Sequence, residues 1–167
     1  MSIRLSLTLL CGLALAPAAV AATHATGDGV LELKAVNATR VVIQGSRGAI
    51  WGQIDKGTLR VVDPNPDDNL VAFVSGAEQV RPTLDPGVTI YSGKNIHFRF
   101  SGSKYGFSIS GAGVDVTAVG VGKAWLTGAG SLDDGDYAVD DGKWQSVPFL
   151  KKLVTFGVQP VLTTTTP

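Results

Sequence analysis

The chain of 167 residues has one cysteine, two histidines and no excess of either charge. The cysteine, Cys11, lies within residues 1–21, so the rest of the chain has no disulfide to stabilise its fold. Without a histidine cluster or a cysteine pair, the sequence gives no zinc or iron signature. Lysine plus arginine equals aspartate plus glutamate, at 14 each. This balance predicts no binding of nucleic acid or of an anionic membrane surface, because both partners favour basic proteins.

Long apolar runs are also missing, except at the start of the chain. Residues 1–4 form a short segment with a basic residue, residues 5–16 are apolar, and Ala19-Val20-Ala21 is a run of small residues. This is the layout of a cleaved secretory signal, and its apolar part is short for a membrane-spanning helix. We predict a signal peptide at residues 1–21 and an exported protein, periplasmic or extracellular, with no transmembrane segment after cleavage. An uncleaved anchor is the alternative.

The remaining residues show no helical periodicity over ten or more positions. Short alternating runs are separated by glycine, proline, asparagine and aspartate, a pattern typical of an all-β domain. We predict one such domain at residues 22–158. The threonine-rich tail at residues 159–167 has no apolar pattern and is predicted to be disordered.

Glycines recur every nine residues, at Gly93, Gly102, Gly111 and Gly120. Type II′ turns at 102–103, 111–112 and 120–121 would produce an antiparallel meander over residues 94–127. Such a meander keeps the apolar columns on one face, with Phe98 opposite Phe107. The pattern therefore predicts a single antiparallel β-sandwich or open barrel, with Gly102 at positive φ.

A small β-solenoid without metal would give the same columns and is the alternative fold. Calcium-binding β-rolls also repeat every nine residues, but they need an aspartate in successive repeats. Here Asp115 fits that pattern once, whereas His97, Gly106 and Ala124 replace aspartate in the other repeats. The sequence therefore does not favour a β-roll.

Signatures of nucleophilic catalysis are missing as well. Residues 106–110, Gly-Phe-Ser-Ile-Ser, lack the second glycine of a nucleophile elbow and lie in a predicted strand. His97 has no nearby base or nucleophile in sequence, and it is predicted to point to solvent together with Arg99. We find no nucleophile, zinc or nucleotide signature, and we predict a protein without catalytic residues.

Four residues are candidates for binding a ligand: Trp51, Tyr91, His97 and Arg99. Trp51 is out of phase with Ile50 and Ile54, which places it on the outer face of its predicted strand. A carbohydrate-binding surface would require Trp51 and Tyr91 to be exposed together. The predicted meander instead directs Trp125 inward, where most large aromatic side chains lie.

Acidic residues form the densest cluster of titratable side chains in the sequence. Five acidic residues lie within nine positions: Asp133, Asp134, Asp136, Asp140 and Asp141. Oxygen-rich loops suit Ca²⁺, so these residues are a possible calcium site and calcium is the one cofactor we consider. Alternatively, the same residues are turn formers whose side chains bond nearby backbone.

Three stretches carry a resemblance: residues 47–57, residues 111–115 with Gly120, and residues 135–137 through Trp144 to Pro148. In these stretches the chain resembles a loose group of exported, glycine-rich, all-β bacterial proteins of unknown function. The resemblance spans residues 28–148 and implies no catalytic residues.

These observations predict a non-catalytic exported β-domain with a binding or structural role at the cell envelope. Its expected partner is an envelope or extracellular polymer. A carbohydrate-binding module is the alternative, and a carboxylate-based glycoside hydrolase is the weaker one.

Overall fold

The computed structural model describes residues 25–65, 70–131 and 134–158. In these ranges the chain forms seven strands of one antiparallel sheet, and it contains no helix that could cross a membrane. The all-β, antiparallel and unclosed sheet confirms the predicted fold class. The strands are β1 (Gly29–Ala35), β2 (Thr39–Val62), β3 (Phe73–Pro82), β4 (Val88–Thr127), β5 (Asp136–Val139), β6 (Gln145–Ser146) and β7 (Lys152–Phe156).

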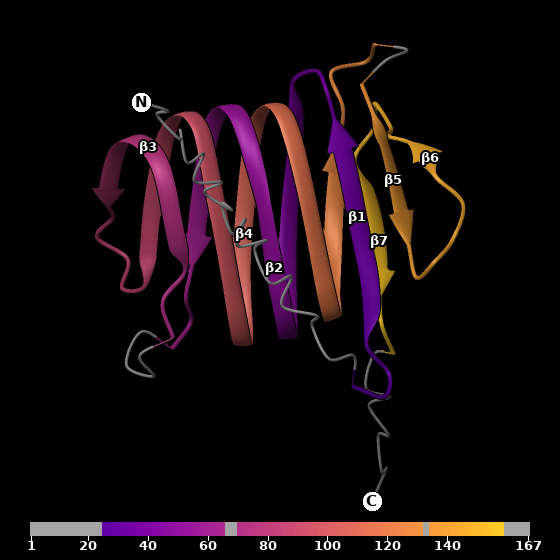
Figure 1. The fold of residues 1–167 in the computed structure, drawn as a ribbon, viewed down its shortest axis with the longest axis horizontal. Helices are drawn as coiled ribbons and strands as arrows, with labels where there is room; N and C mark the ends of the chain where they lie inside the picture. The colour runs from indigo at the N-terminus through magenta and orange to yellow at the C-terminus, as the bar shows by residue number, and fades with distance from the viewer. Residues whose placement is uncertain (1–24, 66–69, 132–133, 159–167) are drawn as a thin grey trace, which may run out of the picture.

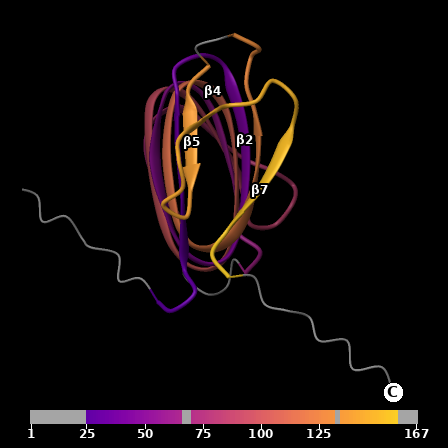
Figure 2. The ribbon, with the colours of Figure 1, turned by 90° about the vertical axis from the view of Figure 1, so that its right-hand side faces the viewer.

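Two of these strands are coiled around each other. β2 and β4 have 24 and 40 residues, whereas strands in globular proteins usually have about 3–10. Most residues of β2 pair on both sides with β4: Ile54, for example, pairs with both Ile96 and Val114. One turn of β4 therefore takes 18 residues in this part, and β2 runs antiparallel between successive turns. Figure 1 shows these turns as neighbouring arches, and Figure 2 shows the resulting flattened tube from one end.

The flattened tube has two walls, which we name after the strands that complete them. In the β1 wall the hydrogen-bonded order is β3, β4, β2, β4, β1, β5 and β6. In the β7 wall the order is β3, β4, β2, β4, β2, β4 and β7. Each pass of β2 or β4 crosses one wall, bends, and returns through the other wall.

The core lies between the two walls. Residues alternate between buried and more exposed along β1, β2 and β4, as expected for strands with one solvent-facing side. Aromatic side chains from both walls meet in the interior: Phe100 lies 5.5 Å from Tyr105 and 6.3 Å from Phe107 between ring centroids. The interior of the tube is therefore filled by packed side chains. This packing stabilises the fold without disulfides.

The nine-residue glycine period marks the bends of the tube. Half a turn of β4 is nine residues, so glycines nine apart lie alternately at the two bends. Gly48 pairs with Gly102 and Gly120 at one bend, and Gly57 pairs with glycines 93 and 111 at the other. A Cβ atom added to Gly48 would lie 1.9 Å from the carbonyl oxygen of Val119. Glycine is required at this position because the backbones approach too closely for a side chain.

The predicted type II′ turns are wrong. β4 continues through residues 102–103, 111–112 and 120–121, and neither Gly102 nor Gly111 has a positive φ. The chain bends gradually around the end of the flattened tube, so the halves of the expected hairpins lie in opposite walls. The alternative of a parallel solenoid does not describe the fold either, because antiparallel β2 separates the turns of β4.

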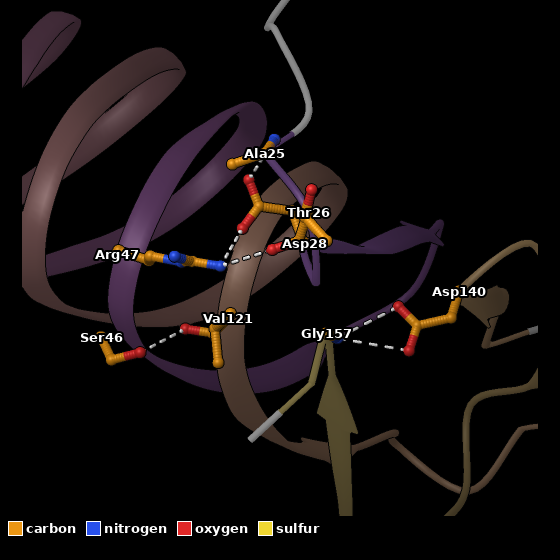
Figure 3. Close-up of polar contacts among 8 residues, drawn as sticks. All are labelled: Ala25, Thr26, Asp28, Ser46, Arg47, Val121, Asp140 and Gly157. Atoms are coloured by element: carbon orange, nitrogen blue, oxygen red, sulfur yellow. Dashed lines mark hydrogen bonds and ion pairs between the residues drawn. The ribbon is translucent and has the colours of Figure 1, made fainter. Parts of the chain in front are cut away.

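A bulge and an ion pair lie beside one bend. Gly45 pairs with Gly122 and Arg47 with Val121, so Ser46 is an extra residue, and its hydroxyl donates to the Val121 carbonyl at 3.1 Å. The Arg47 guanidinium lies 3.0 Å from the Asp28 carboxylate, an ion pair drawn in Figure 3. The ion pair attaches the segment before β1 to strand β2.

Candidate binding groove on the β1 wall

A groove of about 1710 Å³ runs across the outer face of the β1 wall. Strands β3, β4, β2 and β1 all contribute to it, so residues far apart in sequence line a single surface. Its aromatic and titratable lining residues are Asp28, Glu32, Lys34, Trp51, Phe73, His97, Phe98, Arg99, Phe100 and Asp115.

An aromatic–cation row crosses the groove. Phe73 pairs with Arg99 and Arg99 pairs with Trp51, so the three side chains lie on adjacent strands on the solvent side. The Arg99 guanidinium lies 5.1 Å from the centre of the Phe73 ring. Phe73 is 56% exposed and Trp51 is 40% exposed. Two strand spacings place these aromatic residues about 9.6 Å apart along the row.

A polar row runs parallel to the aromatic one. His97 pairs with Gln53, Gln53 pairs with Asp115, and Asp115 pairs with Lys34. His97, Gln53 and Lys34 are exposed, and the residues that alternate with them, such as Ile54, are buried. This row presents hydrogen-bond donors and acceptors two residues away from the aromatic side chains.

The charges in the groove are balanced. Arg99 and Lys34 are matched in number by Glu32 and Asp115, while the carboxylate of Asp28 is paired with Arg47 outside the groove lining. Within the described ranges, no ion pair shorter than 4.0 Å joins the four unpaired groups. These charged groups are therefore available to a ligand, and their formal charges sum to zero.

The structure brings together three of the four predicted ligand-binding residues. Trp51, His97 and Arg99 all line the groove, and Trp51 lies on the outer face as predicted. Tyr91 does not join them. It lies in the β7 wall, paired with Leu59, and packs partly buried against the core.

The predicted inward position of Trp125 is wrong. Trp125 lies on the outer face of the β7 wall, in one row with Val42 and Leu153, because the buried neighbours Ala124 and Leu126 occupy the inward positions. The ammonium groups of Lys123 and Lys151 lie 5.1 and 5.5 Å from the centre of its ring.

Sequence reasoning missed Phe73, Gln53, Glu32 and Asp115 as groove residues. A usable signal was present in the glycine period. Arg99 precedes Gly102 by three residues, Trp51 follows Gly48 by three, and both glycines belong to one bend. Equal distance from a shared bend places residues in one row across the sheet.

The acidic segment is divided among separate contacts. Asp134 is buried and accepts hydrogen bonds from the amides of Gly130 and Ser131 at 2.6 and 3.1 Å. Asp136 accepts one from the hydroxyl of Ser146 at 3.2 Å. Asp141 is exposed with a left-handed φ of 58°.

Asp140 makes the longest-range of these contacts. Its carboxylate accepts a hydrogen bond from the amide of Val30 at 2.9 Å. It also accepts one from the amide of Gly157 at 3.2 Å (Figure 3). Among the described residues, no three acidic, histidine or cysteine side chains are grouped to hold a metal ion. Asp133 lies outside the described residues, so a calcium site that includes it stays a prediction.

Comparison of the chain with protein-family models, curated proteins and solved structures found no significant match. The resemblance to exported glycine-rich proteins therefore stays a prediction.

Proposed function

We propose that the protein is a non-catalytic binding module whose ligand lies across the β1 wall. The ligand class we propose is an extended, largely uncharged carbohydrate polymer of the cell envelope or its surroundings. One observation carries this proposal: the groove combines the row of Phe73, Arg99 and Trp51 with a parallel row of polar side chains.

Sugar rings match both rows. Their C–H faces pack on aromatic rings, and their hydroxyl groups bond amide, carboxylate and cationic side chains, the combination expected at a small-ligand site. The spacing of about 9.6 Å between Phe73 and Trp51 matches alternate rings of an extended glycan, with the ring between them lying over Arg99. The balanced charge of the groove favours an uncharged polymer over a strongly anionic one.

A direct experiment is a glycan-array screen with the purified chain, followed by calorimetry with the best oligosaccharide. Trp51→Ala should weaken binding by about thirtyfold or more, as expected when a central aromatic residue is removed. Trp125→Ala is the matched control, because this tryptophan lies in the other wall, and it should leave affinity unchanged. Equal affinities of the wild type and Trp51→Ala would contradict the proposal.

One observation favours a glycoside hydrolase as the second candidate. Glu32 pairs with Thr117 and Asp115 with Lys34, so the two carboxylates are diagonal neighbours with Cα atoms about 7–8 Å apart. A separation of about 6.5–9.5 Å between carboxyl groups is typical of inverting glycosidases. Incubation of the bound oligosaccharide with wild type and Glu32→Gln decides the matter. Intact ligand with both proteins supports the binding module, whereas cleavage by the wild type alone supports the hydrolase.

The proposal also includes export, supported by the sequence of residues 1–21. Expression of the full chain beside a chain that begins at Ala22 tests it. The full chain should be found outside the cytoplasm in a shortened form, and the shorter chain should stay inside.

A further inference from the structure

The outer face of the β7 wall carries positive charge without any negative charge. The seven passes of this wall, at residues 40–44, 58–62, 79–82, 88–92, 106–110, 123–127 and 152–156, contain no aspartate or glutamate. The outward basic residues of these passes are Arg40, Arg60, Arg81 and Lys123, and Lys151 directly precedes β7. By contrast, acidic residues alternate with basic ones on the β1 wall.

These five basic side chains are available to a partner. Four of them are exposed and Arg60 is half-buried. In the part of the chain that the structure describes, none forms an ion pair shorter than 4.0 Å. The zero net charge of the sequence therefore conceals a separation of charge, because most of the acidic residues lie elsewhere on the molecule.

Apolar side chains accompany the basic ones at one end of this wall. The ammonium groups of Lys123 and Lys151 both lie near the ring of Trp125, and Leu153 is the neighbour of Trp125 across the sheet. Leu153 is 52% exposed. Phe149 and Leu150, just before β7, are 65% and 76% exposed.

We propose that the β7 wall docks on the surface of an anionic lipid bilayer. Basic side chains near a bilayer are attracted by anionic headgroups, and tryptophan and exposed apolar side chains are favoured at the interface below them. A soluble polyanion would use the basic residues but would leave Phe149, Leu150 and Leu153 in water. The combination of both kinds of side chain therefore favours the bilayer.

This placement is compatible with the carbohydrate site but does not depend on it. The two walls face in opposite directions (Figure 2), so a chain that docks by its β7 wall presents the groove of the β1 wall away from the lipid. Docking and glycan binding should therefore be separable by mutation.

The test is co-sedimentation of the full chain with vesicles of phosphatidylcholine, with and without phosphatidylglycerol. We expect binding only when phosphatidylglycerol is present, and weaker binding as salt is added. Each basic residue removed should weaken binding about fivefold, so the double variant Arg60→Gln/Lys123→Gln should bind about 25-fold more weakly. The matched control is Arg99→Gln/Lys34→Gln, which changes net charge equally on the β1 wall and should bind within about twofold of wild type.

The apolar contribution is tested separately. Phe149→Ser should weaken vesicle binding by about tenfold, while circular dichroism shows an unchanged fold. Equal losses in the two double variants would overturn the proposal, because net charge rather than this wall would then be responsible. Binding to heparin or DNA without binding to anionic vesicles would also overturn it, in favour of a soluble polyanion.

Discussion

The ring of Phe98 stacks on the ring of Phe107, with centroids 5.5 Å apart and ring planes at 29°, although no backbone pairing joins the two residues. Phe98 lies in the β1 wall and Phe107 in the β7 wall, nine residues further along β4. The contact therefore crosses the interior of the tube. It joins the two walls half a turn apart, where the backbone hydrogen bonds run only within each wall.

We expect this contact to contribute a measurable coupling energy. Phe107→Ala should lower the free energy of unfolding by about 3–5 kcal/mol, since Phe107 is fully buried. A double-mutant cycle with Phe98→Leu and Phe107→Leu should give a coupling of about 0.5–1.5 kcal/mol in urea unfolding. The pair Phe98 and Phe156 is the control, because Phe156 lies several strands further along the tube. This cycle does not distinguish the flattened tube from a hairpin meander, because the two rings would be close in both. Additive effects of the Phe98 and Phe107 substitutions would, however, contradict the stacking of the two rings.

The bends provide a second prediction, which does distinguish the folds. Gly48→Ala should destabilise the protein by several kcal/mol, because its Cβ would overlap the backbone of Val119 at a φ of +126°. At Gly102, φ is not positive, and the atoms nearest to an added Cβ belong to the side chains of Leu70 and Phe100, at 2.9 and 3.1 Å. Gly102→Ala should therefore cost about 1 kcal/mol or less. Thermal melting of both variants provides the measurement. A larger loss at Gly102 than at Gly48 would favour the turn that the structure does not contain.

The fold was predictable in part from sequence. Alternation and glycine spacing identified the all-β class, but the predicted cross-strand pairing of Phe98 with Phe107 was wrong, because their rings meet across the interior without backbone pairing. The kind of contact was not predictable, because nine residues per half-turn produce the same facing pairs in a hairpin ladder and across a flattened coil. The hairpin ladder and the flattened coil differ in the position of β2. That position is determined only by the long-range pairing of Gly48 and Gly57 with the glycines of β4.

The candidate site shows the same division. Strand phase was sufficient to place Trp51, His97 and Arg99 on one outer surface. Phase alone did not place Tyr91, because consecutive half-turns of one strand belong to opposite walls. The charge separation between the walls was also hidden from composition, since it depends on which segments pair across the coil.

A third prediction concerns Asp140, which the sequence suggested as a calcium ligand. Its carboxylate joins the first residues of β1 to the end of β7, through the amides of Val30 and Gly157. Asp140→Ala should lower the free energy of unfolding by about 1–3 kcal/mol, because both amides lose a charged acceptor.

Melting in EDTA and in millimolar calcium separates the structural role of Asp140 from a metal-binding role. The loss should be equal in both solutions, and Asp141→Asn, which retains a residue tolerant of left-handed φ, should change stability little. A loss that appears only with calcium would show that Asp140 binds the ion.

The last prediction follows from the hydroxyl group of Tyr105. The side chain is 4% exposed, and within the described residues its hydroxyl has no hydrogen-bond partner. Burial disfavours the charged phenolate and raises the pKa of Tyr105 well above its ordinary value of about 10. Below pH 10 the phenol is protonated in both the folded and the unfolded chain, so this group causes no pH dependence there. As the pH rises above 10, the unfolded chain loses the proton first, and stability must fall.

Tyr105→Phe removes this group at nearly constant shape. We expect the variant to be as stable as wild type at pH 8, or slightly more stable, because no hydrogen bond is lost and an unsatisfied hydroxyl is removed. Between pH 10 and 11.5, urea unfolding should show a smaller loss of stability in the variant than in wild type. Tyr137→Phe is the control, because the Tyr137 hydroxyl donates to Gln145 at 3.0 Å and accepts from Lys152. That variant should lose about 1–2 kcal/mol already at pH 8. The reverse ranking of the two variants at pH 8 would mean that Tyr105, rather than Tyr137, has the hydrogen-bonded hydroxyl.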